Sequence, residues 1–409
     1  MPRLPPSPGP RCPIPGSGDR LLQLNPDLID TGTPPIPAAR AWMTRYDGGF
    51  GPPIDLSQAA PGSAPPAELL KRLGEAAARP DIARYGAILG DADLRESYAA
   101  ELSHLYGGEI ASADVAITAG CNLAFVAAIL AVAKAGDNVI LPAPWYFNHQ
   151  MTLQMLGIEA RPLICRPEDR FVPAVAAAEA LIDGRTRALV LVTPNNPTGA
   201  IYPDGLIAAF AGLARARGVA LIIDETYRDF LAPGANRAHG LFTEAGWRDH
   251  VIQLYSFSKA YAVPGHRVGA ITAGPAPMAQ VLKVLDSFQI CAARPAQGVL
   301  AWAIGAMQPW RAEVRAAING RISAFEGVVS SCPGWEISSI GAYFAYVRHP
   351  FDGVPAERVA EALAAERGVL GLPGSYFGPG QERHLRFAFA NADVAAISGL
   401  PARLSGLSV

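Results

Sequence analysis

The chain has 409 residues, of which half are hydrophobic and 17% are charged, and its formal net charge is -2. A chain of this length exceeds one typical hydrophobic core and is expected to divide into at least two lobes. The balanced charge gives no electrostatic footprint for nucleic acid, and no apolar run approaches the roughly 20 residues of a membrane span. We therefore predict that neither nucleic acid nor a membrane is a partner.

The cysteines and the N-terminus indicate the compartment. Five scattered cysteines without metal-ligand spacing favour reduced thiols in a cytoplasmic setting, and neither a disulfide framework nor a metal site is expected. Residues 1–20 are rich in proline and lack the apolar stretch of a secretory signal. We predict a disordered arm there, or an over-extended start site.

From about Pro65 the hydrophobic pattern alternates between helix and strand. Helical apolar spacing is found at residues 68–78, 94–106, 122–135 and 206–217. Short apolar runs predict strands at residues 114–118, 138–141, 188–193, 220–223 and 251–255. Such runs, separated by helices, are typical of a parallel sheet buried on both faces. We expect an α/β fold whose ligands bind beyond the carboxyl ends of the strands.

After about Gln308 the pattern changes. A long helix is predicted over 310–329, followed by runs at 335–337, 342–347 and 384–389 that are typical of antiparallel strands. We therefore expect a large domain over 65–306 and a smaller α+β domain over 307–409. Residues 21–64 are expected to join the small domain.

The most informative motif is the segment 255–269, where Ser256, Ser258 and Lys259 follow a predicted strand and Arg267 comes eight residues later. An imine-forming lysine beside hydroxyls and a guanidinium that can hold a phosphate suits pyridoxal phosphate. The alternative is an ordinary solvated lysine. The segment resembles the cofactor-anchoring segment of the class I/II aminotransferases, pyridoxal-phosphate enzymes of fold type I similar to aspartate aminotransferase.

Two other predicted strands also end in polar residues. Residues 220–224 end in Asp224, and a carboxylate there is costly without a cationic partner, unless it merely reaches solvent. The resemblance implies that Asp224 holds the pyridinium nitrogen and that Tyr227 faces the cofactor's phenolic oxygen. It also implies that Asn196, in the segment 193–199, donates to that oxygen and lies beside the substrate.

A glycine precedes the helix predicted after residue 118. Gly120 lets the backbone approach a ligand, and the amides at a helix N-terminus form a ready anion site. The alternative is a simple turn. By resemblance, Cys121 and Asn122 donate backbone N–H groups to the cofactor's phosphate, and the two serines and the arginine of the lysine segment complete the cradle.

Three aromatic residues follow another predicted strand, at 145–147. The resemblance points to Tyr146 as the ring that stacks on the pyridine, with Trp145 as its rival and core packing as the alternative for both. The adjacent His149 matches a branch of the family in which a histidine backs the pyridine-binding aspartate, here Asp224.

A single arginine, Arg386, lies within an apolar run. A guanidinium there is costly unless it meets an anion such as a carboxylate, or unless it reaches solvent from an edge strand. The resemblance implies that Arg386 binds the substrate's α-carboxylate. Ala59 stands where the family often has the glycine that covers the substrate. Tyr85 is expected to reach the phosphate of the neighbouring subunit, which makes the enzyme a homodimer.

The resemblance extends from about Leu56 to the C-terminus. It implies an enzyme that moves an amino group between an L-amino acid and a 2-oxo acid through an imine at Lys259. Phe288, not arginine, stands where dicarboxylate-specific members bind the distal carboxylate, which favours apolar or aromatic donors. Arg294 is nearby, so acidic substrates stay open.

Two other functions stay open at this stage. A pyridoxal-phosphate β-lyase that cleaves C–S bonds shares all of these residues. An aminotransferase-like sensor domain of a transcription regulator would need an N-terminal DNA-binding module, for which the short proline-rich start leaves no room.

Overall fold

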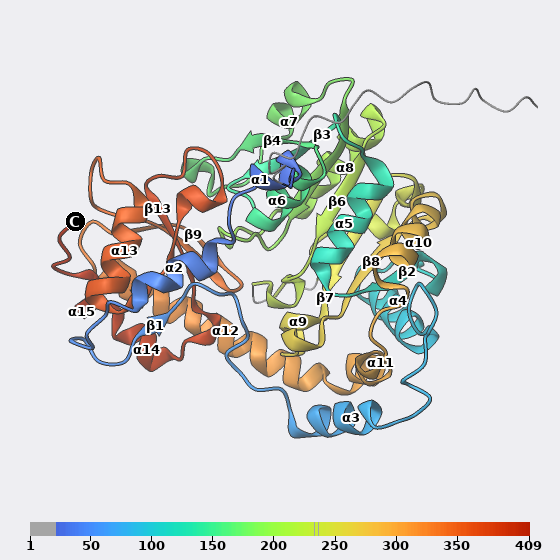
Figure 1. Cartoon of the computed structure of the whole chain (residues 1–409), viewed down its shortest axis with the longest axis horizontal. Helices are drawn as coiled ribbons and strands as arrows, with labels where there is room; N and C mark the ends of the chain where they lie inside the picture. Colours follow the sequence, from blue (N-terminus) through green and yellow to red (C-terminus); the bar gives the residue numbers. More distant parts are fainter. Residues whose placement is uncertain (1–21, 233, 236) are drawn as a thin grey trace, which may run out of the picture.

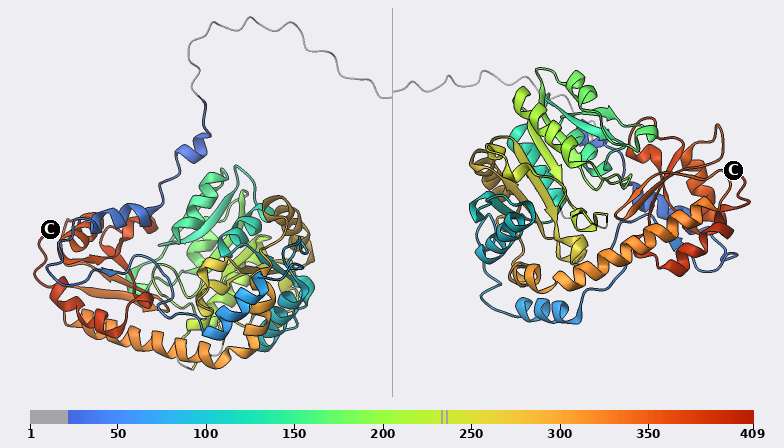
Figure 2. Two further views of the ribbon diagram at one scale, coloured as in Figure 1. Left: turned by 60° about the horizontal axis from the view of Figure 1, so that its bottom comes forward. Right: turned by 180° about the vertical axis from the view of Figure 1, so that it is seen from behind.

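The computed structural model describes residues 22–232, 234–235 and 237–409, and the arm predicted for residues 1–20 lies outside these ranges. Figure 1 shows a larger lobe built around one sheet and a smaller lobe that carries the C-terminus. The long helix α12 (Gln308–Ser330) runs from the large lobe into the small lobe. The same helix is seen from behind in Figure 2.

The large lobe contains a seven-stranded sheet in the order β2-β8-β7-β6-β5-β3-β4. Its strands are β2 (Val115–Thr118), β3 (Asn138–Ala143), β4 (Glu159–Ile164), β5 (Thr186–Val192), β6 (Ala220–Asp224), β7 (Val251–Ser256) and β8 (Gly269–Ala273). All five predicted strands are present, whereas β4 and β8 were not predicted. The sheet is mostly parallel, because only β8 runs opposite to its neighbours.

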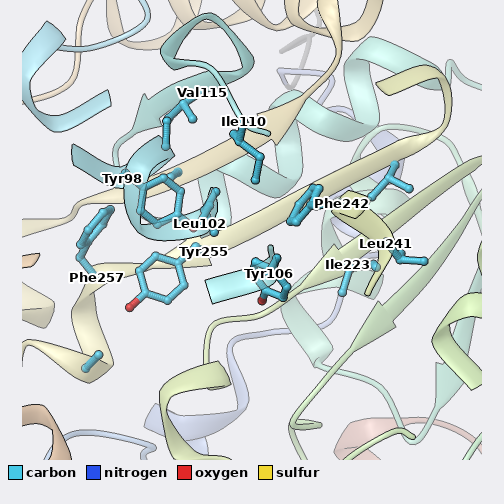
Figure 3. Close-up of a cluster of buried hydrophobic side chains, with 14 of the residues drawn as sticks. Tyr98, Leu102, Tyr106, Ile110, Val115, Ile223, Leu241, Phe242, Tyr255 and Phe257 are labelled. Carbon is cyan, nitrogen blue, oxygen red and sulfur yellow. The ribbon is translucent and has the colours of Figure 1, made fainter. Parts of the chain in front are cut away.

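Successive side chains of a strand point to opposite faces of the sheet. Both faces of this sheet are apolar, and helices cover both of them. On one face, Leu221 and Ile223 of β6 pack with helices α3 (Ala67–Ala77), α4 (Ala92–Tyr106), α7 (Val175–Leu181), α8 (Asp204–Arg217) and α11 (Pro295–Ala306). On the other face, Ile222 packs with α5 (Cys121–Val132), α6 (Phe147–Met155) and α10 (Pro275–Gln289). Figure 3 shows part of the first cluster, where aromatic rings of α4 lie against Ile223 and Tyr255.

One predicted helix is shorter than expected. The helix predicted for 122–135 ends at Val132. Ala133 has an extended backbone, and the N–H of Lys134 donates to the side chain of Asp137 instead of continuing the helix. Gly136 then adopts a positive φ in the turn that leads into β3.

The small lobe is built on an antiparallel sheet in the order β12-β13-β10-β9. Its strands are β9 (Glu336–Gly341), β10 (Phe344–Arg348), β12 (Leu372–Pro373) and β13 (His384–Ala388). The helices beside it are α2 (Pro35–Met43), α13 (Ala356–Arg367), α14 (Val394–Ser398) and α15 (Leu400–Leu404), and α1 (Pro26–Ile29) precedes them. Strand β1 (Ile54–Asp55) pairs with β11 (Val369–Leu370), so the N-terminal segment lies beside the C-terminal strands.

The architecture confirms the expected fold class, a mostly parallel sheet flanked by helices with a smaller α+β part. The exact domain boundaries at residues 64 and 306 stay a prediction. Within the described ranges, no helix combines the length and the apolar character that crossing a membrane requires. The same ranges contain no group of three His, Cys, Asp or Glu side chains placed to hold a metal ion.

Candidate active site

A cavity of about 300 Å³ lies where β5, β6 and β7 end, and the small lobe closes one side of it. It brings together twelve of the predicted site residues: Ala59, Cys121, Asn122, Tyr146, Asn196, Asp224, Tyr227, Ser256, Ser258, Lys259, Arg267 and Arg386. Two predicted residues are not in its lining. Gly120 lies behind Arg267, and Tyr85 is 79% exposed.

Lys259 lies on the short helix α9 (Phe257–Ala260), directly after β7. The hydroxyl of Ser256 accepts from the N–H of Ser258 and caps this helix. The Lys259 amine donates to the carbonyl of Ala59. Burial, together with the charges of Arg267 and Arg386, lowers the pKa of Lys259 to about 8. The amine therefore faces a cavity rather than bulk solvent. Near neutral pH a fraction of the Lys259 side chains is neutral and nucleophilic.

Asp224 is the last residue of β6 and is buried. Its Oδ1 accepts from the N–H of Thr226 at 2.9 Å, and its Oδ2 lies 3.3 Å from Nε2 of His149. Burial alone would raise the pKa of Asp224, but the contacts with His149 and Thr226 together outweigh burial, and the pKa falls below its usual value. The cavity therefore contains a carboxylate that stays ionised at neutral pH.

The N-terminus of α5 and the Lys259 segment form a cradle for an anion. Gly120 has a φ of +83°, and a Cβ at this position would collide with the guanidinium of Arg267. Nη1 of Arg267 lies 3.5 Å from Oγ of Ser258 and donates to the carbonyl of Pro264 at 3.0 Å. Helix N–H groups, hydroxyls and one guanidinium therefore meet at one end of the cavity, a donor set that suits a phosphate.

Arg386, on β13, is 1% exposed, so it is not a side chain that reaches solvent from an edge strand. Its Nη1 donates to Oδ1 of Asn196 at 3.1 Å, and its Nη2 donates to the carbonyl of Ser57. Within the described ranges, its Nε has no hydrogen-bond partner. Burial lowers the pKa of Arg386 to about 10, because neutral acceptors compensate its charge poorly. The arrangement leaves a buried cation that a ligand carboxylate would complete.

The aromatic residues of the cavity favour Tyr146 over Trp145. Tyr146 lines the cavity, whereas Trp145 packs against the apolar cluster under α5. The ring of Tyr146 meets His149 edge-on, with 5.1 Å between ring centroids. Burial raises the pKa of Tyr146 to about 12 and that of Tyr227 well above its usual value, so both phenols stay protonated.

The two residues considered for a distal carboxylate lie outside the lining of the cavity in one chain. Phe288 is 60% exposed. The expectation that Arg294 lies close enough to serve the pocket is not met in the single chain. Its Nε pairs with Asp91 at 3.1 Å and its Nη1 donates to the carbonyl of Asp81.

Several lining residues were assigned no role in the sequence analysis: Ile36, Gln58, Phe147, Val192, Thr226 and Pro264. Gln58 and Thr226 are neighbours of predicted residues, and that adjacency was the available signal. Ile36 carries no such signal, because only the packing of α2 brings it to the cavity.

Comparison with known proteins decides the family. The family model described as aminotransferase class I and II matches residues 52–404. The chain belongs to this family, and it is an aminotransferase. It is 27% identical to an aromatic aminotransferase of Arabidopsis thaliana, over 86% of this chain and 89% of the relative. It is 30% identical to a valine–pyruvate aminotransferase of Mycobacterium tuberculosis, over 73% and 74%.

Solved structures agree with this assignment. An Escherichia coli protein with a methionine aminotransferase function is 25% identical and superimposes with a TM-score of 0.85, over 94% of this chain and 99% of that chain. Aspartate aminotransferase of Thermus thermophilus shares the fold, with a TM-score of 0.85 at 22% identity, over 94% of this chain and all of the neighbour.

Proposed function

We propose that this aminotransferase uses pyridoxal 5'-phosphate to move an amino group between an L-amino acid and a 2-oxo acid, with Lys259 as the residue that holds the cofactor. The observation that carries the proposal is one cavity containing a buried amine, a buried carboxylate, an anion cradle and a buried guanidinium. Each of these groups is suited to bind or react with one part of the cofactor or the substrate.

The residues present fit the cofactor. The pKa of Lys259, about 8, suits an amine that must attack an aldehyde. The ionised Asp224 lacks a cationic partner other than His149 among the described residues and would hold a protonated ring nitrogen. The cradle of α5, Ser256, Ser258 and Arg267 would hold the phosphate, and Tyr146 offers the ring face.

When bound, the cofactor supplies an electron sink for the bond that breaks at the substrate's Cα. Lys259 Nζ would be the base that removes the proton from the substrate's Cα. Asn196 and Tyr227, which line the cavity, would donate hydrogen bonds to the cofactor's phenolic oxygen. Arg386 would orient the amino acid by binding its α-carboxylate, and Ala59 lies in the segment that would cover the substrate.

A homodimer in the cytoplasm is part of the proposal. Tyr85 is exposed in one chain, as a residue that serves a neighbouring subunit would be. The cysteines of the described ranges, Cys121, Cys165, Cys291 and Cys332, are free thiols, which suits a reducing compartment. Apolar walls at Ile36 and Phe147 favour apolar or aromatic donors.

The test is Lys259→Ala with a matched control. The purified protein should be yellow, and borohydride should fix the cofactor to the peptide that contains Lys259. Lys259→Ala should abolish that attachment and transamination, whereas Lys283→Ala, at an exposed lysine of α10, should change neither. Labelling of another lysine would sink the assignment. Turnover that needs no 2-oxo acid acceptor would instead favour the β-lyase.

A further inference from the structure

The segment 57–59 crosses the cavity and contacts two of its charged residues. The carbonyl of Ser57 accepts from Arg386, and the carbonyl of Ala59 accepts from Lys259. Gln58 lies between these two contacts and lines the cavity itself. The function proposed above gives the Gln58 side chain no role. Gln58 is nevertheless the residue of this segment that has a side-chain amide at the cavity.

Gln58 is exposed at the rim of the cavity, and a chain of polar contacts favours one orientation of its amide. Oε1 of Gln58 accepts from Nη2 of Arg40 at 2.8 Å. Nε of Arg40 pairs with Oδ2 of Asp55 at 3.2 Å, and Oδ1 of Asp55 accepts from the N–H of Ser57 at 2.8 Å. Because arginine has only donors, Arg40 selects the oxygen end of the amide. The NH₂ end of Gln58 is therefore directed away from Arg40.

The NH₂ group of Gln58 donates to no other residue of the ranges that the structure describes. Arg40 does not line the cavity, whereas Gln58 does. With its oxygen accepting from Arg40, the amide keeps its two N–H donors available at the rim of the cavity. The neighbouring wall is apolar, since Ile36 and Phe147 line the same cavity. This end of the site therefore combines one polar donor with an apolar surface.

We propose that Gln58 is a specificity-determining residue whose NH₂ group donates to an oxygen at the end of the substrate's side chain. The inference rests on the proposed function and names a substrate class for it: amino acids and 2-oxo acids with a side-chain carboxamide or carboxylate, accepted beside apolar ones. An oxygen on the substrate's side chain would accept hydrogen bonds from the N–H donors of Gln58. An apolar side chain would displace water from these donors and leave them without a partner. Arg40 is a positioning residue, because it acts only through the amide.

The test compares side chains of similar length with and without an oxygen. The half-reaction of the cofactor-loaded enzyme is followed by absorbance with glutamine, glutamate and norleucine, which gives a dissociation constant and a limiting rate for each. Gln58→Leu should lower the preference for glutamine over norleucine about 10-fold, the value of roughly one hydrogen bond. The loss should appear in the dissociation constant rather than in the limiting rate.

Three further variants sharpen the result. Gln58→Glu should disfavour glutamate more than glutamine, because two carboxylates then meet. Arg40→Met should lower the glutamine preference in part, since the amide is then free to turn, and Arg40→Lys should restore it. Gln280→Leu, at an exposed glutamine of α10, is the matched control and should leave the preference unchanged.

Two outcomes are contrary and distinguishable. If Gln58→Leu changes glutamine and norleucine by the same factor while the parent enzyme transaminates both, Gln58 does not read the side chain and this inference is wrong. If the parent enzyme transaminates no amino acid at all, the proposed function fails and takes this inference with it.

Discussion

Two neighbouring carboxylates, Asp224 at the last position of β6 and Glu225 directly after it, face opposite sides of the sheet. Asp224 lies in the cavity beside His149 and Cys121. Glu225 lies on the face of Ile223 and is 0% exposed, as is its partner His239. Both carboxylates are buried and both have a pKa below the usual value, because for each the partners outweigh burial. The two carboxylates differ in whether their protein partners leave them accessible to a ligand in the cavity.

The partners of Glu225 form a closed cluster. Its oxygens accept from the hydroxyl of Tyr106 at 2.6 Å and from Nε2 of Gln253 at 2.9 Å, and Nε2 of His239 lies 3.3 Å away. The nearby Arg228 pairs with Glu101 at 3.3 Å. None of Glu225, Tyr106, His239 or Gln253 lines the active-site cavity.

Two of the buried arginines, Arg228 and Arg386, repeat this contrast. The acidic groups around Arg228, Tyr98 foremost, overcome the effect of burial and hold its pKa well above the usual value. The pKa of Arg386 is instead lowered to about 10, because burial dominates there. Burial of a charge is therefore not by itself a sign of function. A buried charge beside a cavity whose protein partners leave it incompletely compensated indicates a ligand, and a fully paired charge indicates a structural role.

Asp224→Asn should give the largest effect on the chemistry. The change keeps the shape of the side chain but removes the charge that would stabilise the protonated ring nitrogen. We expect a barrier higher by about 3–4 kcal/mol, roughly a 100- to 1000-fold slower half-reaction, with the cofactor still bound. The measurement is the single-turnover rate with a good amino donor. A rate within a few-fold of the parent would mean that Asp224 does not contact the ring nitrogen.

Arg386→Ala should weaken amino-acid binding by roughly 30-fold or more, on the order of 2–5 kcal/mol, because a desolvated carboxylate loses its charged partner. Cofactor affinity should change far less. Dissociation constants from the half-reaction measure the first quantity, and cofactor titration measures the second. Unchanged affinity for every amino acid tested would mean that another residue binds the carboxylate. Arg386 would then not be a ligand-binding arginine that contrasts with the structural Arg228.

Local pattern explains why the catalytic side of this contrast was predictable. Asp224, Asn196 and Lys259 each follow an apolar run that forms a parallel strand, and such strands end at one edge of a sheet. The family's motifs then supplied the expected role of each residue. The fold class followed from the same runs.

The closed cluster and the specificity end of the cavity were not predictable in this way. Tyr106 precedes its partner Glu225 by 119 residues, and nothing in either local sequence indicates the contact. Arg40 meets Gln58 only because α2 packs in the small lobe. Strand β8 was missed as well, and its antiparallel direction depends on pairing with β2 and β7 rather than on its own composition.

Glu225→Gln should destabilise the protein and spare the chemistry. The amide places N–H donors where Tyr106 and Gln253 donate, and it leaves His239 without its carboxylate. We expect a loss of roughly 3 kcal/mol in the free energy of unfolding, as for other broken buried pairs, and a half-reaction rate within a few-fold of the parent.

Urea unfolding of the cofactor-free protein and single-turnover kinetics test the two parts separately. Glu75→Gln removes one member of an exposed pair with Lys71 and is the control, expected within about 0.5 kcal/mol of the parent. A rate as low as that of Asp224→Asn would show that Glu225 takes part in catalysis.

The smallest effect concerns the pH dependence of stability. The pKa of Lys259 falls from 10.5 to about 8 in the folded, cofactor-free protein. Well below pH 8 the lysine is protonated in both states, and the cost of burying its charge is fully present. Between pH 8 and 10.5 the unfolded chain holds the proton that the folded chain has released, so stability rises with pH, by at most about 1.4 kcal/mol per pH unit.

Lys259→Met removes both the titrating amine and the free-energy cost of burying its charge. The variant should therefore be more stable than the parent at pH 7, and the difference between their melting temperatures should narrow from pH 8 towards 9.5. Taking the difference between the two proteins cancels the buried tyrosines, which titrate in both. Lys283→Met, at an exposed lysine, should show a difference that does not vary with pH. A constant difference for Lys259→Met would mean that the amine is compensated in the folded state, as Arg228 is, and that it belongs on the structural side of the comparison.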